Sequence, residues 1–105
     1  MTGPDADTAN FAERIAGEVP VIAKFQTEAC VICRKLDPML AAVAKRLDGR
    51  LGVVDVDAEE SPDLAERYHI RGVPTLILFK AGQEVDRKAG FLTASALREW
   101  LAPHI

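Results

Sequence analysis

Residues 28–38 read "EACVICRKLDP" and hold both cysteines of the chain, Cys30 and Cys33. Two sulfurs so close in sequence cannot stabilise a fold by closing a long loop, so their role is local chemistry. A mostly apolar run ends just before Cys30, and apolar residues at helical spacing begin after Cys33. The stretch therefore predicts the junction between a buried strand and an amphipathic helix.

The composition predicts a single globular domain. The chain has 105 residues, of which 49% are hydrophobic and 28% charged, and its net charge is −3. This length buries a core without cross-links, and no internal repeat points to a second module, so we expect one domain over residues 8–105. The lysines and arginines are scattered rather than gathered into a basic stripe, which argues against nucleic acid as a partner.

Residues 1–7 are polar and acidic, and we expect them to form a disordered or extended tail. They lack the basic start and apolar core of a secretory signal, and no later run approaches the length of a membrane span. These features predict a cytoplasmic protein that does not enter membranes.

Helical and strand patterns alternate along the chain. Helices are predicted over residues 8–16, from the cysteines to about residue 48, from Ser61 onward, and from Thr93 to Pro103. Asp7 or Thr8, Ser61 and Thr93 are the expected N-caps. Strands are predicted over residues 19–26, 51–56, 75–80 and 83–88, the last two as a hairpin. This order predicts an α/β fold in which a crossover helix joins a parallel pair and the hairpin adds antiparallel strands.

The cysteine spacing favours thiol–disulfide exchange. A thiolate at a helix N-terminus is stabilised by unpaired backbone N–H groups, which lowers the pKa expected for Cys30. Cys33, one turn into the helix, is expected to be less exposed and to face Cys30. Cys30 would then attack a substrate disulfide, and Cys33 would resolve the mixed disulfide.

Three other readings of the cysteines are less favoured by the residues. A zinc site needs about four ligands, and the two histidines, His69 and His104, lack the spacing of a ligand pair, so no metal is expected. An iron–sulfur cluster shared by two chains would supply two thiolates from each. The cysteines could also be buried and inert.

Residues 70–75 read "IRGVPT" and place Pro74 immediately before a buried strand, where few backbone geometries tolerate proline. Three segments then occur in one order: "KFQTEACVICRKLDP" (24–38), "VDVDAEESPDLAERYHIRGVPTLILFKAG" (54–82) and "KAGF" (88–91). From about residue 8 to 101 the chain resembles the thioredoxin family. The resemblance implies a thioredoxin fold, in which a central mixed sheet of about four strands is flanked by helices.

The resemblance also implies roles for the loop around Pro74. In the family, the proline matching Pro74 is cis and lies against the cysteine pair, and the residue matching Val73 offers backbone hydrogen bonds to an extended substrate. Gly90 matches a glycine that lets the substrate approach closely. The alternatives are an ordinary turn proline at Pro74 and a glycine at position 90 that simply ends a strand.

The function implied is that of a thiol–disulfide oxidoreductase without a bound cofactor. Its partners would be protein disulfides and a recycling enzyme like thioredoxin reductase, or a low-molecular-weight thiol. The alternative is a binding module that docks a partner through Ala29, Val31, Ile32 and Val73 and uses its sulfurs as a redox latch.

The chain departs from the family at Lys24, where members usually carry a buried acid that moves the proton of the resolving cysteine. A buried lysine could act as a neutral base or as a cation that favours a thiolate at Cys33. Alternatively, it extends to solvent or pairs with Asp55 on the neighbouring strand.

Two further departures concern the rim of the site. Val31 and Ile32 separate the cysteines, and with Ala29, Val73 and Phe91 they would form an apolar docking rim. Gln26 and Ala29 replace the aromatic pair usually found before the cysteines, so Trp100 is expected to pack in the core instead of beside the sulfurs.

No strand pattern precedes Thr8, so the first family strand is expected to be missing. Residues 51–56 would then form an exposed sheet edge, consistent with a monomer or a weak dimer. His69 is expected at the surface and Arg71 is expected to support its loop. Asp55, Asp57, Glu59 and Glu60 are interpreted as a solvated face rather than a metal site.

Overall fold

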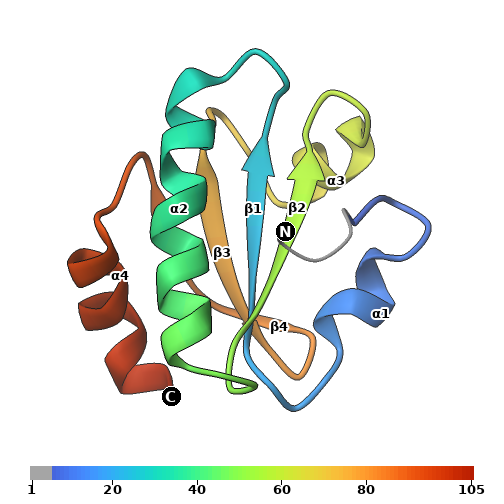
Figure 1. Ribbon diagram of the computed structural model, residues 1–105. Helices are drawn as coiled ribbons and strands as arrows, with labels where there is room; N and C mark the ends of the chain where they lie inside the picture. The colour runs from blue at the N-terminus through green and yellow to red at the C-terminus, as the bar shows by residue number, and fades with distance from the viewer. Residues whose placement is uncertain (1–5) are drawn as a thin grey trace.

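The computed structural model describes residues 6–105, which form a four-stranded mixed sheet with helices on both faces (Figure 1). The elements follow one another along the chain as α1 (Phe11–Ile15), β1 (Val21–Gln26), α2 (Val31–Arg46), β2 (Gly52–Asp57), α3 (Pro62–Arg67), β3 (Thr75–Lys80), β4 (Gln83–Ala89), α4 (Ala94–Leu101) and a short 3₁₀ helix (Ala102–His104). The strand order is β2-β1-β3-β4. The predicted α/β fold is confirmed.

Strand direction in the sheet follows from the connections. β1 and β2 are parallel and are joined by α2, whereas β3 is antiparallel to both β1 and β4. Because β3 runs opposite to β1, the start of β3 lies beside the end of β1, with Thr75 opposite Phe25. The loop that leads to the cysteines and the loop that contains Pro74 therefore meet at one end of the sheet.

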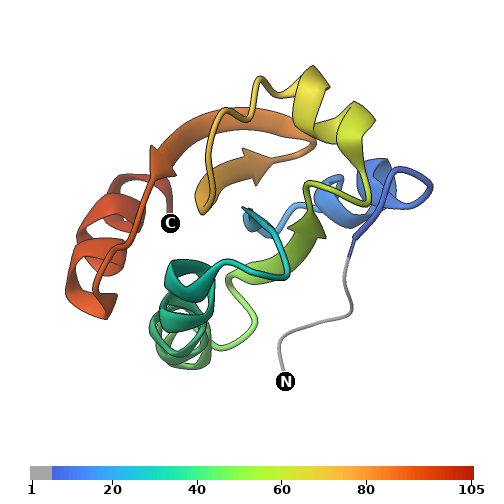
Figure 2. The same cartoon turned by 90° about the horizontal axis from the view of Figure 1, so that it is seen from above.

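The two faces of the sheet bury separate apolar cores. In β1, Ala23 and Phe25 pack with Phe11 of α1 and Leu64 of α3, whereas Ile22 packs with side chains of α2 and α4. Figure 2 shows α2 and α4 on one side of the sheet and α1 and α3 on the other. Alternation along the strand places Lys24 on the side of α2.

Trp100 of α4 packs in the core, as predicted, with 8% of its surface exposed. Its indole N–H donates a hydrogen bond to the Asp86 carboxylate at 2.9 Å. The Thr93 cap is also confirmed, since its hydroxyl oxygen accepts from the Ala96 N–H at 3.1 Å. Both contacts anchor α4, one to β4 and one to the preceding loop.

One helix start and one helix cap differ from the prediction. Residues 8–10 form a turn, so α1 begins at Phe11, because Asp7 and Asn10 hold that turn with reciprocal side-chain to backbone hydrogen bonds. Ser61 occupies the N-cap of α3, but its hydroxyl makes no capping bond. Its carbonyl accepts from the backbone of Leu64 and Ala65 instead.

The edge of β2 is less open than expected. The Ala6 N–H donates to the Asp55 carbonyl at 2.7 Å, which makes a parallel bridge to Val56, and Ala6 is 3% exposed. The prediction of an uncovered edge is therefore wrong at this position. Residues 1–5 of the expected N-terminal tail lie outside the described residues.

Candidate active site

Cys30 and Cys33 are joined by a disulfide at the N-terminus of α2, with their Cα atoms 5.3 Å apart. Cys30 is the N-cap residue, and its Sγ accepts a hydrogen bond from the Cys33 backbone N–H at 3.1 Å. Cys33 is 1% exposed, whereas Cys30 is partly exposed. The strand-to-helix junction and the lower exposure of Cys33 are thus confirmed.

The loop before β3 has the geometry implied by the resemblance. The peptide bond between Val73 and Pro74 is cis. Thr75 Oγ1 donates to the Gly72 carbonyl at 2.7 Å, and the Gly90 N–H donates to the Pro74 carbonyl at 2.9 Å. The loop is therefore tied to both β3 and the end of β4.

Val73 presents its backbone without an internal partner. No hydrogen bond joins its N–H or C=O to any other residue in the described range 6–105. Gly90 has φ +89°, a conformation that favours glycine, and a Cβ added there would meet no atom within 4 Å. Gly90 thus has both a positive φ at the end of β4 and open space on its Cβ side. A glycine that ends a strand and a glycine that lets a substrate approach are therefore compatible.

Most of the apolar side chains expected at the docking rim are exposed. Val31 is 55% exposed, Ile32 44% and Phe91 45%, and Ala29 is also exposed. Val73 is half-buried and precedes the buried Pro74. Large apolar side chains with this exposure are typical of surfaces that bind another molecule.

Lys24 has no exposed surface, and its Nζ contacts two carboxylates. One belongs to Asp37 of α2, and the other, 3.5 Å away, belongs to Asp55, its direct neighbour on β2. Of the two alternatives for Lys24, pairing with Asp55 is therefore observed, and extension to solvent is not. The contact with Asp37 was not predicted, although a carboxylate four residues after Cys33, on the same helix face, was a usable signal.

The acidic residues near β2 have separate structural roles. Asp55 pairs with Lys24, while Asp57 Oδ1 accepts the backbone N–H groups of Glu59 and Glu60. Within residues 6–105, no three histidine, cysteine or acidic side chains are placed to hold a metal ion. His69 is exposed just after α3, and Arg71 is exposed in the following loop.

Comparison with known proteins agrees with this geometry. The family model described as Thioredoxin matches residues 4–103. The chain belongs to the thioredoxin family. It is 36% identical over 99 residues to thioredoxin 1 of Nostoc sp., covering 94% of this chain and 92% of that one. It is 33% identical over 105 residues to the thioredoxin of Rickettsia bellii, covering the whole of both.

A third relative has a less specific name. The chain is 39% identical over 94 residues to a thioredoxin-like protein of Synechocystis sp., covering 89% of this chain and 90% of that one. Family membership together with the Cys30–Cys33 pair makes this protein a dithiol–disulfide oxidoreductase. None of the helices between residues 6 and 105 is long and apolar enough to cross a membrane.

Proposed function

We propose that this thioredoxin-family protein exchanges electrons with protein disulfides, with Cys30 as nucleophile and Cys33 as resolving thiol. The observation that carries these roles is the asymmetry of the pair. Cys30 is partly exposed and its sulfur accepts a backbone N–H at the helix N-terminus, whereas Cys33 is buried. The reachable sulfur is thus the one whose thiolate the helix stabilises.

The exchange has two steps. The Cys30 thiolate attacks one sulfur of the substrate disulfide and expels the other as a thiolate, which takes a proton from water. The Cys33 thiol then gives its proton to water and its sulfur attacks Cys30 Sγ, which releases the second substrate sulfur as a thiolate that takes up a proton in turn. The substrate gains two electrons, and the protein is left with the Cys30–Cys33 disulfide that the structure contains.

Substrate docking is proposed at the cis-proline loop. The free N–H and C=O of Val73 suit an extended substrate segment, with Pro74 beneath it and the open side of Gly90 next to it. Exposed side chains of Ala29, Val31 and Ile32 would supply apolar contact near Cys30. This arrangement separates backbone recognition from the hydrophobic contact that selects among substrates.

Lys24 is proposed to tune Cys33 from beneath α2. It is linked to α2 through Asp37, one helical turn after Cys33. Lys24→Ala, with Lys24→Gln as a milder variant, should therefore change the pH profile of exchange. Lys35→Ala removes an exposed lysine from the same helix and should leave the profile as it is. An unchanged profile in both Lys24 variants contradicts the proposal.

The same proposal covers the recycling partner, the cellular location and the oligomeric state. A reductase like thioredoxin reductase, or a small thiol, would return the disulfide to the dithiol, and no bound cofactor takes part. The protein would work in the cytoplasm as a monomer or weak dimer, without nucleic acid or membrane as partner.

Turnover separates catalysis from the alternative of a redox latch, which the lysine at position 24 favours. With excess dithiothreitol, the protein should reduce many equivalents of a protein disulfide such as that of insulin, and Cys30→Ser should abolish this activity. A single equivalent of reduction followed by arrest would support the latch.

A further inference from the structure

A cavity of about 360 Å³ lies beside the proposed docking loop. Val73, Pro74 and Gly90 form its wall toward that loop. Its polar side chains are those of Thr75, His69, Arg71 and Arg87. No carboxylate lines the cavity, although the whole chain carries a net charge of −3.

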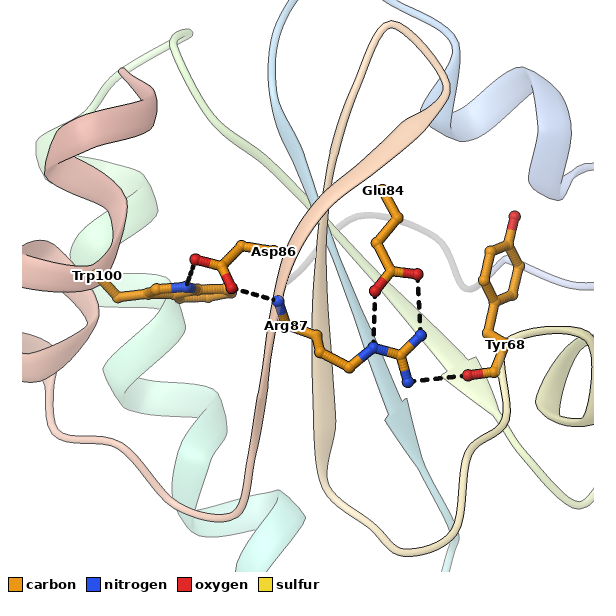
Figure 3. A network of polar contacts seen from close by, with 5 residues as sticks. All are labelled: Tyr68, Glu84, Asp86, Arg87 and Trp100. Carbon is orange, nitrogen blue, oxygen red and sulfur yellow. Dashed lines mark hydrogen bonds and ion pairs between the residues drawn. The ribbon is translucent and has the colours of Figure 1, made fainter.

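Arg87 lines this cavity, and hydrogen bonds hold its side chain in place. Its Nε and Nη2 donate to the two oxygens of Glu84 at 2.7 and 2.9 Å, and its Nη1 donates to the Tyr68 carbonyl at 2.9 Å (Figure 3). The Arg87 guanidinium holds the pKa of Glu84 below its usual range, so the pair stays ionised at neutral pH. The charge of Arg87 is therefore largely neutralised by its own neighbour.

A register shift in the β3–β4 hairpin makes the ion pair between Glu84 and Arg87 possible. Residues three apart on a regular strand point to opposite faces, so Glu84 and Arg87 would not meet. Between Leu78 and Phe79 the register shifts by one residue, and Glu84 then lies opposite Phe79 while Arg87 lies opposite Ile77. Figure 3 shows the result, with the side chains of Glu84 and Arg87 meeting on one side of β4 while Asp86 is directed to the other.

Arg71 is the cavity's unneutralised cation. It is exposed, it lies two residues before Val73, and it forms no ion pair with any residue from 6 to 105. A guanidinium presents several donors in a plane that matches a carboxylate. Beside a substrate chain held at Val73, Arg71 is placed to meet a side chain that projects into the cavity.

We propose that this cavity is a subsite for an acidic side chain of the protein substrate, with Arg71 as its specificity-determining residue. The proposal rests on the proposed docking of substrate at Val73 and Pro74. A preferred substrate would then combine an apolar residue for the rim of Val31, Ile32 and Phe91 with an Asp or Glu close to the reacting cysteine. The contact adds selectivity and speeds encounter more than it adds affinity.

Matched peptides test the proposal. Each peptide carries one cysteine linked by a disulfide to neutral thiopyridine, with Glu or Gln at successive positions on either side of the cysteine. The second-order rate constant of the reduced protein should be about fivefold higher for Glu than for Gln at one or two positions, the size expected of one exposed ion pair. The preference should shrink as salt rises.

Variants assign the effect to Arg71. Arg71→Gln should remove the preference for Glu. Arg98→Gln lowers the net charge equally at an exposed position of α4 and should keep the preference. A preference that is absent in the unmodified protein, or that survives in Arg71→Gln, overturns the subsite. The neutral disulfide 4,4′-dithiodipyridine should react equally fast with the unmodified protein and with Arg98→Gln, which lies outside the cavity. Failure of the unmodified protein with every disulfide would instead overturn the proposed function.

Discussion

The ammonium group of Lys24 lies beneath α2 between the carboxylates of Asp37 and Asp55. Lys24 is fully buried, and the side chain of Asp55 is 9% exposed, while that of Asp37 retains 40%. Burying charges is costly, and mutual attraction offsets that cost only while the partners remain together. The ammonium group of Lys24 on β1 therefore links β2 and α2 through their carboxylates.

Replacing Lys24 by Met should lower the free energy of unfolding by about 3–5 kcal/mol, because it leaves the buried Asp55 carboxylate without its cation. Urea denaturation followed by circular dichroism measures the loss. Asp37→Asn should cost less, about 1 kcal/mol, because water reaches that carboxylate.

The double variant Lys24→Met/Asp55→Val provides the control. It removes the buried pair and should be more stable than Lys24→Met alone, since an apolar pair can replace a buried ion pair at little cost. If the double variant is no more stable than Lys24→Met, the loss comes from packing and not from an unpaired charge.

At the scale of elements, the N-caps of α3 and α4 differ in their side-chain hydrogen bonds, although both are hydroxyl residues expected from the sequence to cap. Thr93→Ala should lower the free energy of unfolding by about 1 kcal/mol, because it removes the hydroxyl that accepts the Ala96 N–H. Ser61→Ala should cost only a few tenths, since Ser61 makes no capping bond. Equal losses in urea denaturation would contradict this distinction.

α4 is joined to β4 by a contact that responds to pH. The Trp100 indole N–H, followed by the Arg87 backbone N–H, holds the pKa of Asp86 below its ordinary value. A lowered carboxylate pKa means that its stabilising contribution is present above the ordinary value and is lost as the pH falls through the folded value. The contact should therefore persist at pH 4.

Fluorescence of Trp100, the only tryptophan, reports this titration. The emission should change with a midpoint below about 3.9, the ordinary value for Asp, while circular dichroism shows that the protein stays folded. Asp86→Asn should abolish the change. A midpoint at or above the ordinary value would contradict the effect of the hydrogen bond.

Element order was predictable because periodicity depends on burial. The alternation that placed Lys24 beside Asp55 and the apolar spacing of α2 both reflect faces that the fold covers. The start of α1 and the Lys24–Asp37 contact were not predictable from periodicity. The first depends on whether the Asp7 side chain binds a backbone N–H, and the second on which carboxylate reaches the lysine.

For the whole molecule, the placement of the cis-proline loop at the same end as the cysteine pair was predictable only through resemblance, since the two lie over forty residues apart in sequence. The Ala6 bridge was missed because a single paired residue leaves no alternating pattern. The edge of β2 is nonetheless where association between chains would begin.

Ala6→Pro should lower the free energy of unfolding by about 1 kcal/mol, because it removes the N–H that donates to the Asp55 carbonyl. It should also increase self-association in sedimentation velocity at high concentration, because more of the β2 edge is uncovered. Unchanged stability would mean that the bridge does not hold the segment in solution.

The direct test of the account is to trap the intermediate on a protein disulfide substrate. Cys33→Ser should accumulate a mixed disulfide that mass spectrometry locates at Cys30, since Cys30 attacks and nothing resolves it. Cys30→Ser should accumulate none, because the buried Cys33 does not reach the substrate. A mixed disulfide at Cys33 in Cys30→Ser, or none in Cys33→Ser, would contradict the assigned roles.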